Sequence, residues 1–142
     1  MQLSPNFTLA EFTLSQTASR LNIKNIPSAD IIDTLIVTAK GMEEVRKLLN
    51  NKSILVSSGY RGVALNTAVK GSKSSQHTTG EACDFTCPSF GTPDDVVRAI
   101  VNSNIKYDQV ILEFSSWIHI SFSPKNRKQA LIIDSNGTRE YK

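Results

Sequence analysis

The stretch SQHTTGEACD, residues 75–84, carries the most distinctive pattern in the chain. His77 is one of only 2 histidines, and Gly80 after it permits a tight turn because glycine lacks a Cβ. Asp84 follows within residues 81–86, whose composition predicts a β-strand. The pattern predicts a histidine on a turn and a carboxylate on the strand that leaves it.

The second histidine, His119, lies in the segment WIHIS, residues 117–121, which also reads as a strand. Two imidazoles and one carboxylate are ligands that suit Zn²⁺, and three protein ligands leave a fourth position open for water. A zinc ion in such a site lowers the pKa of bound water to about 7 and polarises an amide carbonyl. His77, Asp84 and His119 are therefore expected to hold zinc for metal-assisted hydrolysis.

The N-terminal part reads as mainly helical. Apolar residues recur at helical spacing over 31–49, which predicts a long amphipathic helix. Ser28 is its expected N-cap, and residues 50–51, both Asn, its expected end. Residues 8–11 have the spacing of a capping box, so a short helix is expected to begin there. Residues 15–28 are expected to be irregular.

The rest of the chain alternates between strand and turn patterns. Strands are expected at 53–58, 81–86, 108–114 and 117–122, with the last two as a hairpin, and an edge strand at 130–133. A helix is expected over 93–103, and residues 59–76 are expected to be irregular. The sum is an α+β fold with a small antiparallel sheet and flanking helices. We expect a single zinc peptidase domain, 1–142, with a helical part over about 1–50 and a zinc-binding core over about 53–124.

Composition narrows the class of protein. The chain has 142 residues, 39% hydrophobic and 20% charged, with a net charge of +3. These values fit one compact domain. Cys83 and Cys87 make no disulfide framework and are expected to be small buried apolar residues. The basic residues form no run or aromatic-interleaved stripe, so nucleic acid is not an expected partner. A nucleic-acid-binding domain is kept only as an alternative.

The N-terminus, MQLSPNFTLAEF, lacks the basic and apolar regions of a signal peptide. No segment is apolar over the length that a membrane crossing needs. The protein is therefore expected to be made in the cytoplasm as a soluble chain without membrane insertion. Separately, we expect it to be a monomer.

The two histidine segments together resemble a known family. Residues 75–84 read Ser-x-His-x-x-Gly-x-Ala-x-Asp and residues 117–121 read Trp-x-His-x-Ser. This pair is similar to the zinc D-Ala-D-Ala carboxypeptidase family, which includes phage endolysins, and most of all to its short single-domain branch. The resemblance covers about residues 4–124, and further shared stretches lie at 6–12, 58–61, 64–66 and 107–109.

The resemblance implies a fold like that of the hedgehog and D-Ala-D-Ala peptidase domains, with zinc held by His77, Asp84 and His119. It also implies a substrate among the peptides of bacterial peptidoglycan. Such a phage enzyme is made in the host cytoplasm and reaches the wall after a holin opens the membrane, or travels as a virion component. The sequence does not choose between D-Ala-D-Ala carboxypeptidase, L-Ala-D-Glu endopeptidase and D-Ala-diaminopimelate endopeptidase activity.

The general base departs from the family pattern. Many members place an acid three residues before the last histidine, where this chain has Ser116. Glu113 is our candidate, because in a hairpin of 109–114 with 117–122 it can share the face of His119. Asp108 is the fallback for the base, although the role that we expect for it is structural.

Further site residues follow from the resemblance and the neighbourhood. Arg61 matches a family arginine that binds or polarises substrate, a role that suits a planar guanidinium. Ser75 is expected to hydrogen-bond a zinc ligand. The expected lining of the substrate groove is Tyr60, Gln76 and Trp117. The alternative to an enzyme is a non-catalytic, zinc-containing wall-binding or virion structural protein, which the serine at position 116 motivates.

Overall fold

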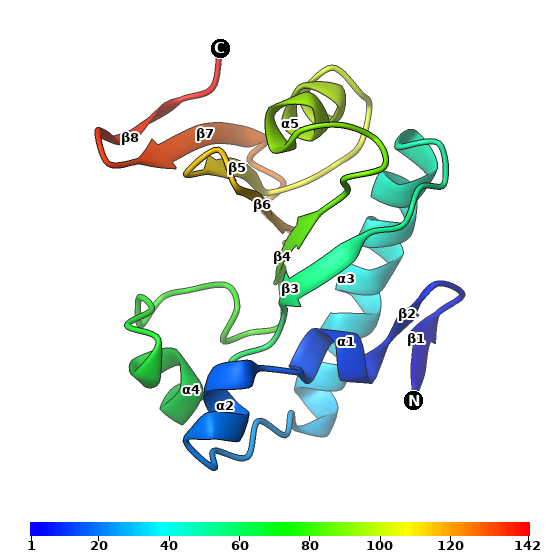
Figure 1. Cartoon of the computed structure of the whole chain (residues 1–142). Coiled ribbons are helices and arrows are strands. Elements are labelled where there is room, and N and C mark those ends of the chain that lie inside the picture. Colours follow the sequence, from blue (N-terminus) through cyan, green and yellow to red (C-terminus); the bar gives the residue numbers. More distant parts are fainter.

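The computed structural model describes residues 1–142 and confirms the α+β class (Figure 1). The helices are α1 Leu9–Thr13, α2 Gln16–Arg20, α3 Ala29–Leu48, α4 Val63–Ala68 and α5 Pro93–Val101. The strands are β1 Gln2–Ser4, β2 Phe7–Thr8, β3 Leu55–Ser58, β4 Ala82–Thr86, β5 Gln109–Glu113, β6 Trp117–Ser121, β7 Gln129–Asp134 and β8 Gly137–Glu140. No helix combines the length and apolar character that a membrane crossing requires.

The main sheet has the strand order β3-β4-β6-β5-β7-β8, and β1 and β2 form a separate antiparallel pair. Neighbours in the main sheet are antiparallel except β5 and β7, which run parallel. Residues 130–133 are in a strand, as predicted, but the prediction of an edge position was wrong. Residues 137–140 add β8 outside them, because the chain turns back at Gly137 with a φ of +101°.

The long helix α3 crosses behind β3 and β4 (Figure 1) and supplies much of the core. Ser28 caps it by accepting a hydrogen bond from the Ile31 N–H at 3.3 Å. Leu35, Met42 and Val45 are fully buried, and each such side chain contributes roughly 1.5–3 kcal/mol by leaving water. Residues 50–51 both have a φ of +59° and end the helix, as predicted.

Two segments expected to be irregular contain short helices. The Ser15 hydroxyl caps α2 by accepting the Ala18 N–H at 3.1 Å, and α4 buries Leu65 and Asn66. Helices of five and six residues are too short to show helical periodicity in the sequence. Tertiary contacts and capping stabilise them instead.

The hairpin of β5 and β6 is confirmed. Its turn holds Phe114 and Ser115 at φ +53° each, and the Ser116 N–H donates to the Glu113 carbonyl at 2.9 Å. Two successive left-handed residues are normally Gly, Asn or Asp.

The expected helix at 93–103 begins as predicted, with Thr92 and Asp95 forming a capping box, and ends at Val101.

Helix α3 also fixes the turn that carries His77. The buried Thr38 hydroxyl donates to the Gly80 carbonyl at 2.6 Å. Gly80 has a φ of +83°, and a Cβ there would lie 3.3 Å from side-chain atoms of Ile31 and Leu35. The turn therefore needs glycine for its backbone conformation and for its closeness to the helix.

Replacing Gly80 with Ala is expected to lower the free energy of unfolding by about 2 kcal/mol, from left-handed strain plus crowding against α3. Chemical denaturation measures the loss. Gly137→Ala is the matched control, because its φ is also positive but nothing lies within 4 Å of the added Cβ. It should lose only about 1 kcal/mol. Equal losses in the two variants would contradict the crowding against α3.

Candidate metal centre

Strand register brings Asp84 and His119 together. Asp84 on β4 lies directly opposite His119 on β6, and both side chains are buried. His77 reaches the same point from the turn before β4 and is also buried. The structure therefore assembles the three side chains that the sequence singled out.

The ligand atoms lie at distances that suit one metal ion. Asp84 Oδ1 is 2.9 Å from His119 Nδ1 and 3.1 Å from His77 Nε2, and the three ligand atoms lie within 4.8 Å of one another. Ligands about 2.0–2.1 Å from a tetrahedral zinc are about 3.3 Å apart. The donor set of two imidazoles and a carboxylate fits zinc in type and spacing.

A backbone carbonyl orients the first of these ligands. His77 Nδ1–H donates to the Gly59 carbonyl at 2.7 Å. This hydrogen bond leaves Nε2 as the ring nitrogen with a free lone pair, directed at Asp84, in the neutral imidazole. Gly59 was not predicted as part of the site, although it ends the expected strand 53–58.

Asp84 is held as a carboxylate. Burial alone would raise its pKa, but contacts with His119 and His77 hold the pKa well below its ordinary value. The Arg61 guanidinium lies 3.6 Å from the second oxygen, Oδ2. A charged carboxylate is the form that binds a metal.

Arg61 is placed by contacts on two sides. Its Nε–H donates to the Ser58 hydroxyl at 3.2 Å, and its backbone N–H donates to the His77 carbonyl at 3.0 Å. The side chain is 18% exposed, so its guanidinium can meet a ligand while it faces Asp84. The structure thus brings Arg61 to the metal ligands.

Glu113 lies on the same sheet face as His119. It pairs with Trp117 across the hairpin, and the next pair on that face is Ile111 with His119. Such diagonal neighbours are about 7–8 Å apart, within reach of a long side chain. Burial raises the pKa of the Glu113 carboxyl above its ordinary value, the Asp84 carboxylate adds to this, and His119 opposes it.

An aromatic pair borders Glu113. The Trp117 indole lies 5.6 Å from the ring of Phe114, which is 51% exposed. The indole N–H is buried without a hydrogen-bond partner, although it lies near enough to Glu113 to favour the charged form of that carboxyl. Phe114 was missed in the sequence, where it reads as the end of a strand.

Gln76 belongs to a polar cluster behind the metal ligands. Its side-chain N–H donates to Asp108 Oδ2 at 2.8 Å, and the Arg127 guanidinium donates to both oxygens of Asp108 at 2.9 and 2.8 Å. Asp108 is fully buried. Arg127 therefore holds the pKa of the Asp108 carboxyl well below its ordinary range. Both oxygens of Asp108 accept hydrogen bonds, which fits the structural role expected from the sequence.

Two further residues predicted to belong to the site, Ser75 and Tyr60, lie close to it but do not contact the metal-ligand atoms. The Ser75 hydroxyl accepts the backbone N–H of His77 at 3.2 Å and does not contact its ring. Tyr60 lies beside Arg61 in a groove of about 540 Å³. Both cysteines are buried and unpaired, as expected.

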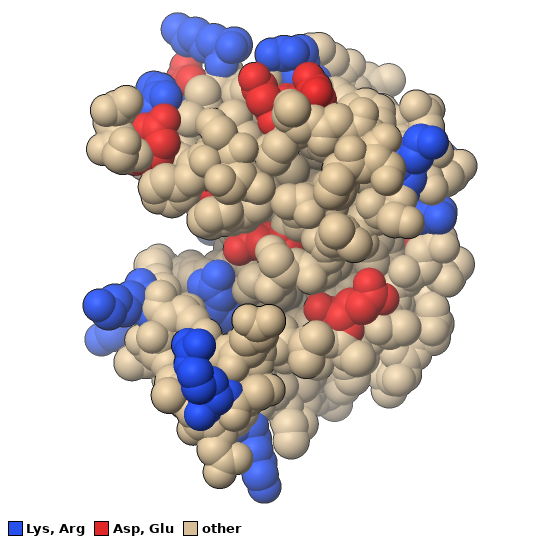
Figure 2. All heavy atoms as spheres, in the orientation of Figure 1, with Lys and Arg blue, Asp and Glu red and all other residues tan.

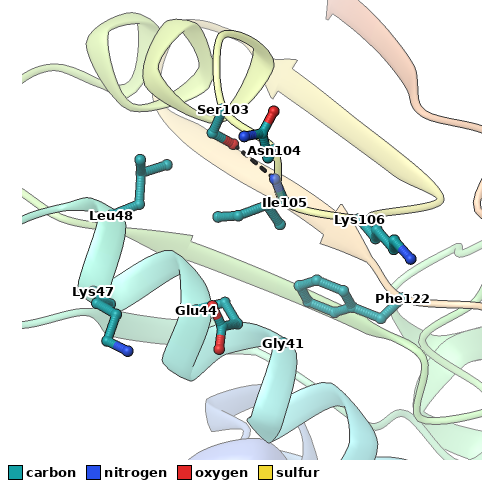
Figure 3. A pocket seen from close by; sticks show the side chains of 9 residues that line it. All are labelled: Gly41, Glu44, Lys47, Leu48, Ser103, Asn104, Ile105, Lys106 and Phe122. Carbon is teal, nitrogen blue, oxygen red and sulfur yellow. Dashed lines mark hydrogen bonds between the residues drawn. The ribbon is translucent and has the colours of Figure 1, made fainter.

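A second hollow of similar size, about 550 Å³, lies away from the metal ligands (Figure 3). It runs between α3 and the segment after α5. The Phe122 ring covers Gly41 there, where a Cβ would come within 2.6 Å of it. None of the predicted site residues lines this hollow.

Arg127→Ala is expected to destabilise the protein at neutral pH, because it leaves the buried Asp108 carboxylate without its cation. The pKa of Asp108 is depressed in the fold, so its contribution is present above the unfolded pKa of about 3.9 and is lost as pH falls below it. The stability gap between variant and wild type should therefore narrow below about pH 4. Urea denaturation at several pH values measures the gap.

Arg139→Ala is the matched control. Arg139 makes a similar two-bond pair with Asp134 at 3.0 and 2.8 Å, but the Asp134 side chain is 25% exposed. Exposed ion pairs add little stability. Arg139→Ala should therefore lower the free energy of unfolding several-fold less than Arg127→Ala does at neutral pH. A gap for Arg127→Ala that does not depend on pH would contradict the assignment to Asp108.

Comparison with known proteins agrees with this geometry. The profile of the family described as Peptidase M15 matches residues 5–121, which include all three candidate metal ligands, Arg61 and Glu113. No curated protein matches the chain closely enough to count as a relative. The resemblance to zinc D-Ala-D-Ala carboxypeptidases is thereby confirmed at the level of the family. The chain belongs to the Peptidase M15 family and is a peptidase of that type.

Proposed function

We propose that the protein is a zinc-dependent peptidase that hydrolyses amide bonds in the stem peptides of peptidoglycan. The convergence of His77, Asp84 and His119 at distances that suit zinc is the observation that carries the proposal. Family membership supports the reaction class, and Glu113 on the same sheet face offers the base that hydrolysis needs.

His77 Nε2, Asp84 Oδ1 and His119 Nδ1 would hold the zinc. When bound, zinc acts as a Lewis acid on the scissile carbonyl and lowers the pKa of a water molecule to about 7. Glu113 accepts the proton of the attacking water and passes it to the leaving amine. Its half-buried position, beside Asp84 and His119, suits a carboxyl that must take up a proton and release it again.

Arg61 binds the substrate. Its guanidinium approaches Asp84 while its Nε–H is fixed on Ser58. A planar cation in this place can donate to a peptide carbonyl or carboxylate beside the scissile bond. Trp117, paired with Glu113, and Tyr60, beside Arg61 in the groove, would contact the substrate. Gln76 lies outside that groove with its side-chain amide on Asp108, so it would meet the substrate only from the turn before His77.

The biological setting that fits these roles is the wall of a host bacterium. We propose that the protein is a phage or prophage enzyme, made in the host cytoplasm as a monomer. It would act after holin-dependent release or as part of the virion. Mass spectrometry of digested peptidoglycan would identify the bond and so choose between carboxypeptidase and endopeptidase activity.

His77→Ala is expected to remove bound zinc and to reduce muropeptide release to background, because two ligands no longer suffice. Zinc content by elemental analysis and product release by mass spectrometry check this. Ser135→Ala, at an exposed turn, is the control and should keep both. Full activity in His77→Ala would refute the proposed site.

Glu113→Gln should retain zinc and lower kcat by about 100- to 10,000-fold, since the amide cannot act as a general base. Glu140→Gln, an exposed carboxyl on β8, is the matched control with kcat near wild type. Steady-state kinetics on purified muropeptides measure both.

The second candidate is a non-catalytic wall-binding or virion protein, favoured by Ser116 at the usual position of the acid. That candidate is correct if neither wild type nor Glu113→Gln releases product while both bind zinc and cell wall. A wild-type enzyme that releases product excludes it.

A further inference from the structure

The free edge of β3 borders a groove that leads to Arg61. β3 is the terminal strand of the main sheet, so only β4 pairs with it. An unpaired strand edge presents backbone N–H and C=O groups to any extended chain beside it. Proteins use such edges to bind peptides by adding a strand to the sheet.

The groove follows this edge. Its volume is about 540 Å³, and Val56, Ser57 and Ser58, three consecutive residues of β3, all line it. Successive side chains of a strand point to opposite faces, so a hollow that touches all three runs along the strand edge. Its other walls come from residues 14–17, at the start of α2, and from α4 with the following Val69.

Arg61 links the groove to the metal ligands. Ser58 is paired with Asp84 in the sheet, and Arg61 both lines the groove and lies 3.6 Å from Asp84. Figure 2 shows the molecule hollowed between the part with β5–β8 and the part with α2 and α4. A chain in the groove would therefore reach Arg61 first and the metal ligands next.

The charge of the residues that line the groove indicates what kind of ligand it can bind. Arg61 is the only charged residue in its lining, which otherwise consists of aliphatic, hydroxyl, amide and tyrosine side chains. A neutral surface with one cation at the inner end suits a peptide that carries a carboxylate. The stem peptides of peptidoglycan carry such carboxylates.

We propose that the acidic part of the peptide substrate binds in extended form along the free edge of β3, with a carboxylate on Arg61. This subsite rests on the proposed function and deepens it. It predicts that main-chain amides of the substrate, in addition to its side chains, contribute to binding. Val69 is 39% exposed on the groove wall, so a charge introduced at this position would face a bound substrate.

The test uses zinc-loaded Glu113→Gln protein, so that a synthetic stem pentapeptide is not consumed. Val69→Glu should raise the Kd at least about fivefold over Val69→Gln, by repelling the carboxylate. The gap should shrink in high salt and with a peptide whose carboxylates are amidated. Val37→Glu, at an exposed valine on α3 outside the groove, should leave the Kd unchanged.

Two further measurements address the strand edge directly. Peptide binding should shift the backbone amide NMR signals of residues 55–58, while those of β8 at the other sheet edge stay in place. Methylation of alternate main-chain amides of the peptide should weaken binding about tenfold or more, because a methylated amide cannot donate.

The results separate the subsite from the proposed function. If wild type cuts muropeptides, but the Val69 variants bind alike and residues 55–58 do not shift, the subsite is wrong and the peptidase stands. If zinc-loaded wild type neither binds nor cuts these peptides, the proposed function fails, and the subsite with it.

Discussion

The site depends on one register, the pairing of Asp84 on β4 with His119 on β6. Side chains alternate along a strand, so a slip of one residue would turn one of these ligands toward the core. The same register aligns β5, because Ile111 lies opposite His119 and Glu113 one pair further along the same face. The apolar residues between these positions, such as Ile118 and Ile120, are fully buried on the other face and stabilise this register against the alternative.

The third ligand comes from a turn, and the N-terminal half of the chain holds that turn. Thr38 of α3 donates to the carbonyl of Gly80, and the carbonyl of Gly59 after β3 accepts the His77 ring N–H. On the far side, Gln76 is tied through Asp108 to Arg127. His77 therefore lies between three fixed supports, which is the preorganisation that a metal ligand requires.

Sequence reasoning predicted the elements whose signals are local. The period of α3, the capping box at Thr8 and the helix start at Pro93 depend on residues a few positions apart, and they are confirmed. The metal-ligand set could be proposed because histidine is rare in this chain and the motif spacing is specific. Contacts such as that of Gln76 with Asp108, 32 positions apart, leave no local signal. The strand β8 and the helices α2 and α4 were missed because they are short and held by their neighbours.

X-ray absorption spectroscopy of the zinc-loaded protein tests the central claim most directly, because it identifies the atoms around the metal. The account predicts one zinc per chain with only nitrogen and oxygen neighbours at about 2.0–2.1 Å, two of the scatterers being imidazole rings. A sulfur neighbour at about 2.3 Å would place the metal on Cys83 or Cys87 instead. That result, or a spectrum without imidazole, would contradict a centre built from His77, Asp84 and His119.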